Sequence, residues 1–126
     1  MRSLSVLLGN WENVSELIFR KSLEAGGHLV KYMPLWRREK EFLKEARMSQ
    51  YDLVILAILG LPPEPALRMI APVRSASDAK VVVFSGVGNE EYREAALRDG
   101  AFAFYKLPMP LEGIREALEQ AARNPG

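Results

Sequence analysis

The chain has 126 residues, of which 48% are hydrophobic and 26% charged, and its net charge is +1. This composition is typical of a globular domain with its own core. The sequence has no Cys and a single His, which excludes thiolate zinc sites and cysteine nucleophiles and argues against a His-rich metal site. The near-neutral charge gives no global attraction for nucleic acid, and no apolar run is long enough to cross a membrane. We expect one cytoplasmic domain over residues 1–126, without bound metal or cofactor.

Apolar runs alternate with helical patterns through the first half of the chain. Residues 4–8 predict a short strand that ends at Gly9-Asn10. A helical pattern then begins at position 13 and stops at Gly26-Gly27, because glycine commonly ends helices. Residues 53–59 are apolar on both faces, as a central strand of a parallel sheet must be.

The same alternation continues through the second half. Pro65 suits the first turn of a helix, and we expect that helix to end before Pro72. Asn89 is a suitable N-cap for the next helix, which runs to Arg98. We expect a cis peptide bond at Leu107-Pro108, because this bond would form a tight turn between the last strand and the last helix.

Strand and helix thus alternate five times. This pattern specifies a parallel sheet with helices on both faces. Right-handed crossovers leave few topologies, and at this length we expect a flavodoxin-like, three-layer α/β sandwich with strand order 2-1-3-4-5 and five helices. The strands are predicted at 4–8, 28–33, 53–59, 80–84 and 101–106, and the helices at 13–25, 37–48, 65–71, 89–98 and 111–122.

Short segments of this chain have the order and spacing of a known family. They are Y-D-L-V-I-L-A at 51–57, S-G-V-G-N-E-E at 85–91, G-A-F-A-F at 100–104 and then Leu107-Pro108. Gly100 lies fifteen residues after Ser85, and Leu107 twenty-two. Over essentially its full length the chain resembles the receiver domain of bacterial response regulators.

The resemblance implies a phosphoryl-transfer site, and this chain departs from it at nearly every position. Receivers use an aspartate acceptor, an acidic pair that holds Mg²⁺, a lysine that neutralises the phosphoryl oxygens and a hydroxyl that contacts them. Only the hydroxyl is kept here. At the matching positions the chain has Ala57 for the acceptor, Gly9 and Asn10 for the acidic pair, Leu107 for the lysine and Ser85 for the hydroxyl.

Two neighbouring positions complete the comparison with receivers. Lys106 lies one residue before the lysine position, and strand periodicity sends its side chain to the opposite face. The aromatic switch position is Phe104, which has no phenol. Loss of the nucleophile, the metal ligands and the lysine together removes the reaction, and an unpaired charge left in an apolar crevice would be costly. We therefore expect a pseudo-receiver that is not an enzyme and is not phosphorylated.

The resemblance also implies where a partner would bind. Receivers commonly signal through the face formed by the fourth helix, the fifth strand and the last helix. We expect a signalling or effector protein, or a second copy of the chain, to dock there, so that the domain acts as a regulatory interaction module in bacterial signal transduction. On this face the chain has Tyr92, Arg93, Phe102, Phe104 and Lys106.

A repurposed small-molecule site in the crevice is the alternative, with Asn10 and Ser85 as polar contacts. Ser85 is not expected to be a nucleophile, because the only His, His28, opens the edge strand and no base lies near the serine.

Three further features have two interpretations each. Trp11 either fills the vacated crevice or anchors a partner, or it simply covers the first helix. Glu12 either replaces a lost acidic residue of the site or is favoured by the dipole at the start of the first helix, and we adopt the dipole interpretation. The basic residues of 37–47 lie next to Trp36, but acidic residues interrupt them. We interpret this segment as a solvated amphipathic helix and expect no direct binding of nucleic acid.

Overall fold

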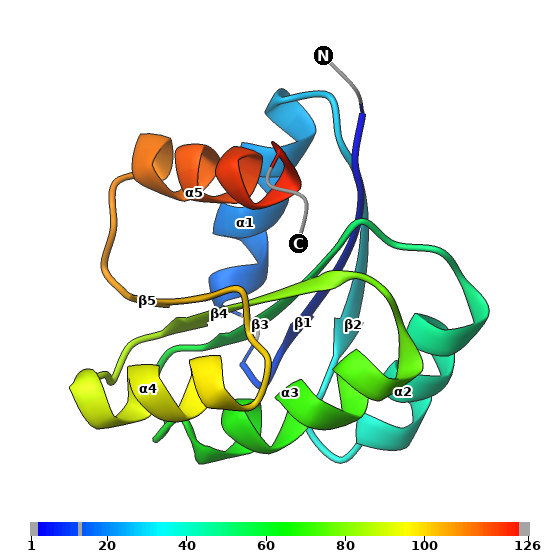
Figure 1. The fold of residues 1–126 in the computed structure, drawn as a ribbon. Coiled ribbons are helices and arrows are strands. Elements are labelled where there is room, and N and C mark those ends of the chain that lie inside the picture. Colours follow the sequence, from blue (N-terminus) through cyan, green and yellow to red (C-terminus); the bar gives the residue numbers. More distant parts are fainter. Residues whose placement is uncertain (1–2, 13, 124–126) are drawn as a thin grey trace.

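The computed structural model describes residues 3–12 and 14–123. It contains one parallel five-stranded sheet of order β2-β1-β3-β4-β5, which confirms the predicted topology. Figure 1 shows the alternation of strands and helices along the chain. The strands are β1 (Ser5–Asn10), β2 (Leu29–Pro34), β3 (Leu53–Ile58), β4 (Lys80–Ser85) and β5 (Ala103–Lys106), and the helices are α1 (Val14–Ala25), α2 (Glu39–Met48), α3 (Glu64–Ala76), α4 (Glu90–Arg98) and α5 (Leu111–Arg123).

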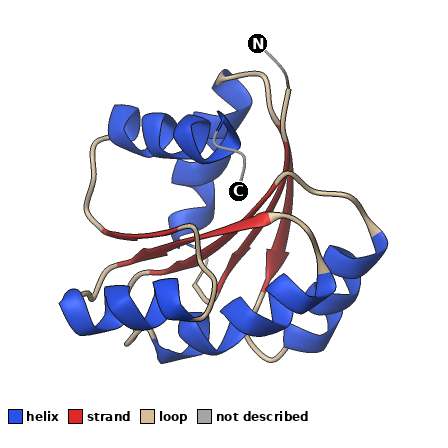
Figure 2. Ribbon diagram, in the orientation of Figure 1, coloured by secondary structure: helices blue, strands red, loops and turns tan. Residues whose placement is uncertain are grey.

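The sheet lies between two helical layers, so the molecule has three layers. Helices α1 and α5 cover one face, and α2, α3 and α4 cover the other (Figure 2). Because strand side chains alternate between faces, each face has its own apolar cluster. Phe19 of α1 packs in the cluster that contains Ile55, whereas Phe42 of α2 packs in the cluster that contains Leu56.

Strand β3 is the centre of this arrangement. It pairs with β1 on one side and β4 on the other, and all six of its residues are fully buried. Strands β2 and β5 form the two edges of the sheet. Complete burial of β3 explains why its sequence is apolar at every position.

Helix α3 differs from its prediction. The helix continues through Pro72 and ends at Ala76. Proline interrupts one backbone hydrogen bond in a helix interior, but Pro72 itself is exposed while Ile70 and Val73 are completely buried against the sheet. Burial of this helix face therefore outweighs the local cost of the proline.

Three local predictions are confirmed. Pro65 lies in the first turn of α3. The Asn89 side chain accepts a hydrogen bond from the Tyr92 backbone N–H at 2.9 Å and caps α4. The peptide bond between Leu107 and Pro108 is cis. Over the described residues, no helix has the length and apolar character needed to span a membrane.

Candidate functional site

The carboxyl ends of four strands meet at one end of the sheet, as predicted. Asn10 at the end of β1 is the register partner of Ala57 in β3, and Ser85 at the end of β4 is the partner of Ile58. Leu107 follows β5 and donates its backbone N–H to the Ser85 carbonyl at 2.7 Å. We call Gly9, Asn10, Ala57, Ser85 and Leu107 the carboxyl-end site.

Two large side chains occupy the space beside Gly9. A Cβ atom at this position would lie 2.5 Å from Phe42 Cε2 and 2.6 Å from Leu35 Cδ1. Both Phe42 and Leu35 are completely buried. In a close-packed core these side chains cannot move away freely. A side chain at position 9 would therefore require Phe42 and Leu35 to move.

Asn10 is also committed to a contact within the chain. Its side chain is 1% exposed, and its Oδ1 accepts a hydrogen bond from the Tyr32 hydroxyl at 2.7 Å. This bond joins the end of β1 to the edge strand β2. A buried amide oxygen requires such a partner, so the bond explains how Asn10 is tolerated in the core.

Two of the predicted site residues, Ala57 and Leu107, lie in the apolar core. Ala57 and Leu107 belong to the same buried cluster as Phe19 and Phe84, on the face covered by α1 and α5. The rings of Phe19 and Phe84 are 4.8 Å apart, in a tilted arrangement that aromatic pairs favour. Lys106, by contrast, is exposed, in agreement with its predicted orientation.

Ser85 is fully buried, and its hydroxyl is used locally. The oxygen accepts a hydrogen bond from the Val87 N–H at 3.1 Å, and the hydroxyl donates to the Val87 carbonyl at 2.5 Å. This pattern organises the turn that follows β4. His28 lies near the other end of the sheet, where its Nδ1 accepts from the Leu4 N–H at 3.0 Å, so no base adjoins the serine.

The loops after β3 and β4 are in close backbone contact. The Gly86 N–H donates to the Ile58 carbonyl at 2.9 Å. A Cβ atom at Gly86 would lie 2.1 Å from the Leu59 carbonyl oxygen, so only glycine fits there. The two loops on either side of the carboxyl-end site are thus held against each other.

The structure decides between the two interpretations of Trp11. Its side chain is 8% exposed and packs in the cluster that contains Leu35, Phe42 and Ile58. This cluster lies on the face covered by α2, α3 and α4, whereas α1 covers the other face. Trp11 therefore fills the core at the end of β1, and the interpretation that it covers the first helix is wrong.

Glu12 makes a contact that sequence analysis missed. Its carboxylate accepts hydrogen bonds from the Leu59 N–H, at 3.0 Å to each oxygen, and from the Gly60 N–H at 2.7 Å. These donors lie in the loop after β3, so the helix-dipole interpretation does not describe its role. The partners are 47 and 48 residues away in the chain, and no local pattern links them.

The predicted partner face is partly exposed and partly core. Tyr92 donates its hydroxyl proton to Glu64 at 3.1 Å, and this hydrogen bond raises the pKa of Tyr92. Phe104 is 7% exposed and packs inward beside Gly88, where a Cβ atom would be 3.1 Å from the ring. Arg93 and Lys106 are exposed and Phe102 is half-buried, so the charged residues dominate the accessible part of this face.

Helix α2 is amphipathic, as interpreted from the sequence. Phe42 and Ala46 are buried, and Lys40, Lys44 and Arg47 are exposed. Trp36, in the loop before the helix, is 58% exposed, and the Arg37 guanidinium lies 5.8 Å from the centre of its ring.

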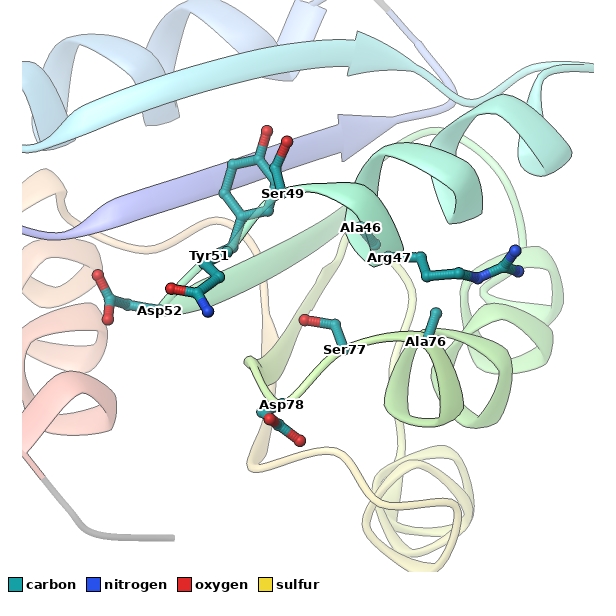
Figure 3. A pocket seen from close by; sticks show the side chains of 9 residues that line it. Ala46, Arg47, Ser49, Tyr51, Asp52, Ala76, Ser77 and Asp78 are labelled. Carbon is teal, nitrogen blue, oxygen red and sulfur yellow. The ribbon is translucent and has the colours of Figure 1, made fainter.

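A polar hollow of about 450 Å³ lies at the opposite, amino end of the sheet (Figure 3). Next to it, Glu45 accepts hydrogen bonds from Tyr51 at 2.5 Å and Ser49 at 2.9 Å. These bonds, with Tyr51 first, lower the pKa of Glu45. Burial, followed by the bond to Glu45, raises the pKa of Tyr51 to about 12. The lining comprises Ala46, Arg47, Ser49, Gln50, Tyr51, Asp52, Ala76, Ser77 and Asp78.

The described residues contain no candidate metal site. Among residues 3–12 and 14–123, no group of three or more His, Cys, Asp or Glu side chains could hold an ion. The carboxyl-end site contributes no carboxylate of its own, and the Glu12 carboxylate is already bound to backbone N–H groups.

Solved structures with a similar fold are response regulators. One from Thermotoga maritima matches with a TM-score of 0.84 and 21% identity, covering 98% of this chain and 100% of its own. One from Burkholderia pseudomallei, which contains a phosphorylated aspartic acid, a calcium ion and citrate, matches with a TM-score of 0.78 and 25% identity over 95% of this chain and 69% of its own. An orphan response regulator of H. pylori matches with a TM-score of 0.75 and 22% identity, covering 96% and 98%.

This chain has the receiver fold. The similarity was found at the level of structure. No protein-family model matches the sequence, and no curated protein matches it either. At 16 to 25% identity to the solved structures, the arrangement of strands and helices is shared while most side chains differ.

Packing at Gly9 gives a first prediction. Gly9→Ala is expected to lower the free energy of unfolding by about 1–3 kcal/mol, the usual cost of overpacking a core. The substitution Phe42→Leu shortens the side chain nearest to the new methyl group, so Gly9→Ala should cost less in that background. Urea denaturation of the two single variants and the double variant measures this coupling. Equal costs in both backgrounds would contradict the packing argument.

The raised pKa of Tyr51 gives a second prediction. Unfolded tyrosine ionises near pH ~10, and the folded value is about 12, so the folded protein favours the neutral phenol. This contribution to stability is complete below about pH 10 and is lost as the pH rises through 12. Tyr51→Phe should therefore show a weaker loss of stability on alkalinisation than the parent chain. Urea midpoints across this pH range give the comparison, and identical profiles would refute it.

Proposed function

We propose that this chain is a non-phosphorylatable pseudo-receiver, without enzymatic activity, that acts as a protein-interaction module in signal transduction. The receiver fold supports a role in signal transduction. The finer proposal is carried by one observation, the apolar packing of the carboxyl-end site. The acceptor position is a buried methyl group at Ala57, and Phe42 and Leu35 fill the space beside Gly9.

The polar groups that remain support the same proposal. Asn10 is bonded to Tyr32, and Ser85 is bonded to the turn at Val87. Each hydrogen bond to an external ligand would have to replace a bond within the chain, with little net gain. These contacts also argue against the alternative that Asn10 and Ser85 bind a small molecule at this end of the sheet.

Docking is proposed at the face of α4, β5 and α5. Arg93 and Lys106 are exposed, Arg93 pairs with Glu90 at 3.2 Å, and Phe102 adds a half-buried aromatic ring. Charged groups at the edge of an interface mainly determine the rate of association and the choice of partner. A cytoplasmic signalling or effector protein, or a second copy of the chain, is proposed to dock there, because exposed charges of both signs lie on this face.

Phosphorylation is the direct test of the site. The parent chain is expected to gain no covalent phosphate from acetyl phosphate and Mg²⁺. The variant Ala57→Asp should gain none either, because the metal ligands and the lysine are still missing. Intact-mass spectrometry measures both, with a receiver that has all the phosphorylation residues as positive control. Stable phosphate on the parent chain would refute the proposal.

Charge reversal tests the docking face. The double variant Arg93→Glu/Lys106→Glu is expected to lose most of the partner recovered by affinity capture from the native cell. The matched control is Lys40→Glu/Lys44→Glu, which reverses two exposed charges on α2 instead. Circular dichroism of both variants checks that they fold. Equal recovery by the two variants would contradict docking at this face.

A further inference from the structure

The contact of Glu12 with the loop after β3 has the geometry of an anion site. Leu59 and Gly60 are consecutive, and both of their N–H groups point at one carboxylate, with donor–acceptor distances of 2.7 to 3.0 Å. Hydrogen bonds from backbone N–H groups to a charged carboxylate are roughly twice as strong as bonds between neutral groups. The two N–H groups therefore bind the carboxylate both by well-directed hydrogen bonds and by attraction to its negative charge.

The position of the two donors explains why they need an occupant. Leu59 and Gly60 follow the end of β3 at Ile58 and precede α3, which begins at Glu64. Neither residue belongs to a strand or a helix that would satisfy its N–H group. A backbone N–H left without a partner in a partly buried loop carries a free-energy penalty. Glu12 supplies an acceptor both to the partly buried Leu59 N–H and to the exposed Gly60 N–H.

The loop after β3 also contacts the loop after β4. The Gly86 N–H donates to the Ile58 carbonyl at 2.9 Å, and the Leu59 carbonyl lies against Gly86. The loop after β3 is thus held both by Glu12 and by the loop after β4.

We propose that the Leu59 and Gly60 N–H groups form a carboxylate-binding site, and that its resident ligand is the Glu12 carboxylate of the same chain. The bound carboxylate ties the end of β1 to the loop after β3, beside the carboxyl-end site. The arrangement keeps these loops in one conformation without any external anion. This inference goes beyond the proposed function, because it depends only on the contacts of Glu12 and is tested by a different measurement.

Amide hydrogen exchange with chemical rescue tests the site. In Glu12→Ala, the Leu59 and Gly60 amides should exchange about tenfold faster than in the parent chain, or more, because a bond to a charged acceptor is lost. Sodium acetate at high concentration supplies a free carboxylate and should restore much of the protection at these two positions. Sodium chloride at the same ionic strength should not. Site-resolved NMR follows both amides.

A matched control separates this site from a helix-dipole effect. Glu112 lies in the first turn of α5 and is exposed, so Glu112→Ala removes a similar charge near a helix start. It should leave exchange at Leu59 and Gly60 unchanged. If Glu12→Ala does not fold, Glu12→Gln provides the same readout with a neutral acceptor and should show an intermediate increase. Unchanged exchange in the Glu12 variants, or equal protection by acetate and chloride, would overturn the inference.

Discussion

The burial of β3 on both faces is the constraint on which the rest of the structure depends. The strand lies between β1 and β4 and between two helical layers, and none of its six residues reaches solvent. A charged side chain at its tip would need a metal ion or a cation beside it, because an unpaired buried charge is costly. With Ala57 near the end of β3, the neighbouring residues need to supply neither a metal ion nor a cation. Leu107 and Phe84 pack with Ala57 in one apolar cluster.

Side-chain packing and hydrogen bonds within the chain surround the carboxyl-end site. Residues from several elements take part: Phe42 of α2 lies beside Gly9, Tyr32 of β2 bonds to Asn10, and Trp11 fills the core at the end of β1. A larger side chain at Gly9 would require these neighbouring side chains to move as well.

The local features were predictable because they depend on neighbours in the chain. Alternating strand and helix patterns indicate a parallel sheet, and the cap at Asn89 involves residues three apart. The prediction for α3 failed because burial of Ile70 and Val73 outweighs the cost of Pro72, and the sequence does not state how deeply a helix face is buried. The role of Glu12 was missed for a related reason, since its partners are 47 and 48 residues away.

The sequence by itself predicted the parallel sheet and its strand order, and it has no Asp, Glu or Lys at positions 9, 10, 57, 85 and 107. Residue identity and periodicity are enough for these conclusions. Only the tertiary structure decided that the space beside Gly9 is filled, that Phe104 packs inward and that Glu12 binds the loop after β3. These outcomes depend on which side chains of distant segments meet in the folded chain, and close packing allows only one of the arrangements that the sequence leaves open.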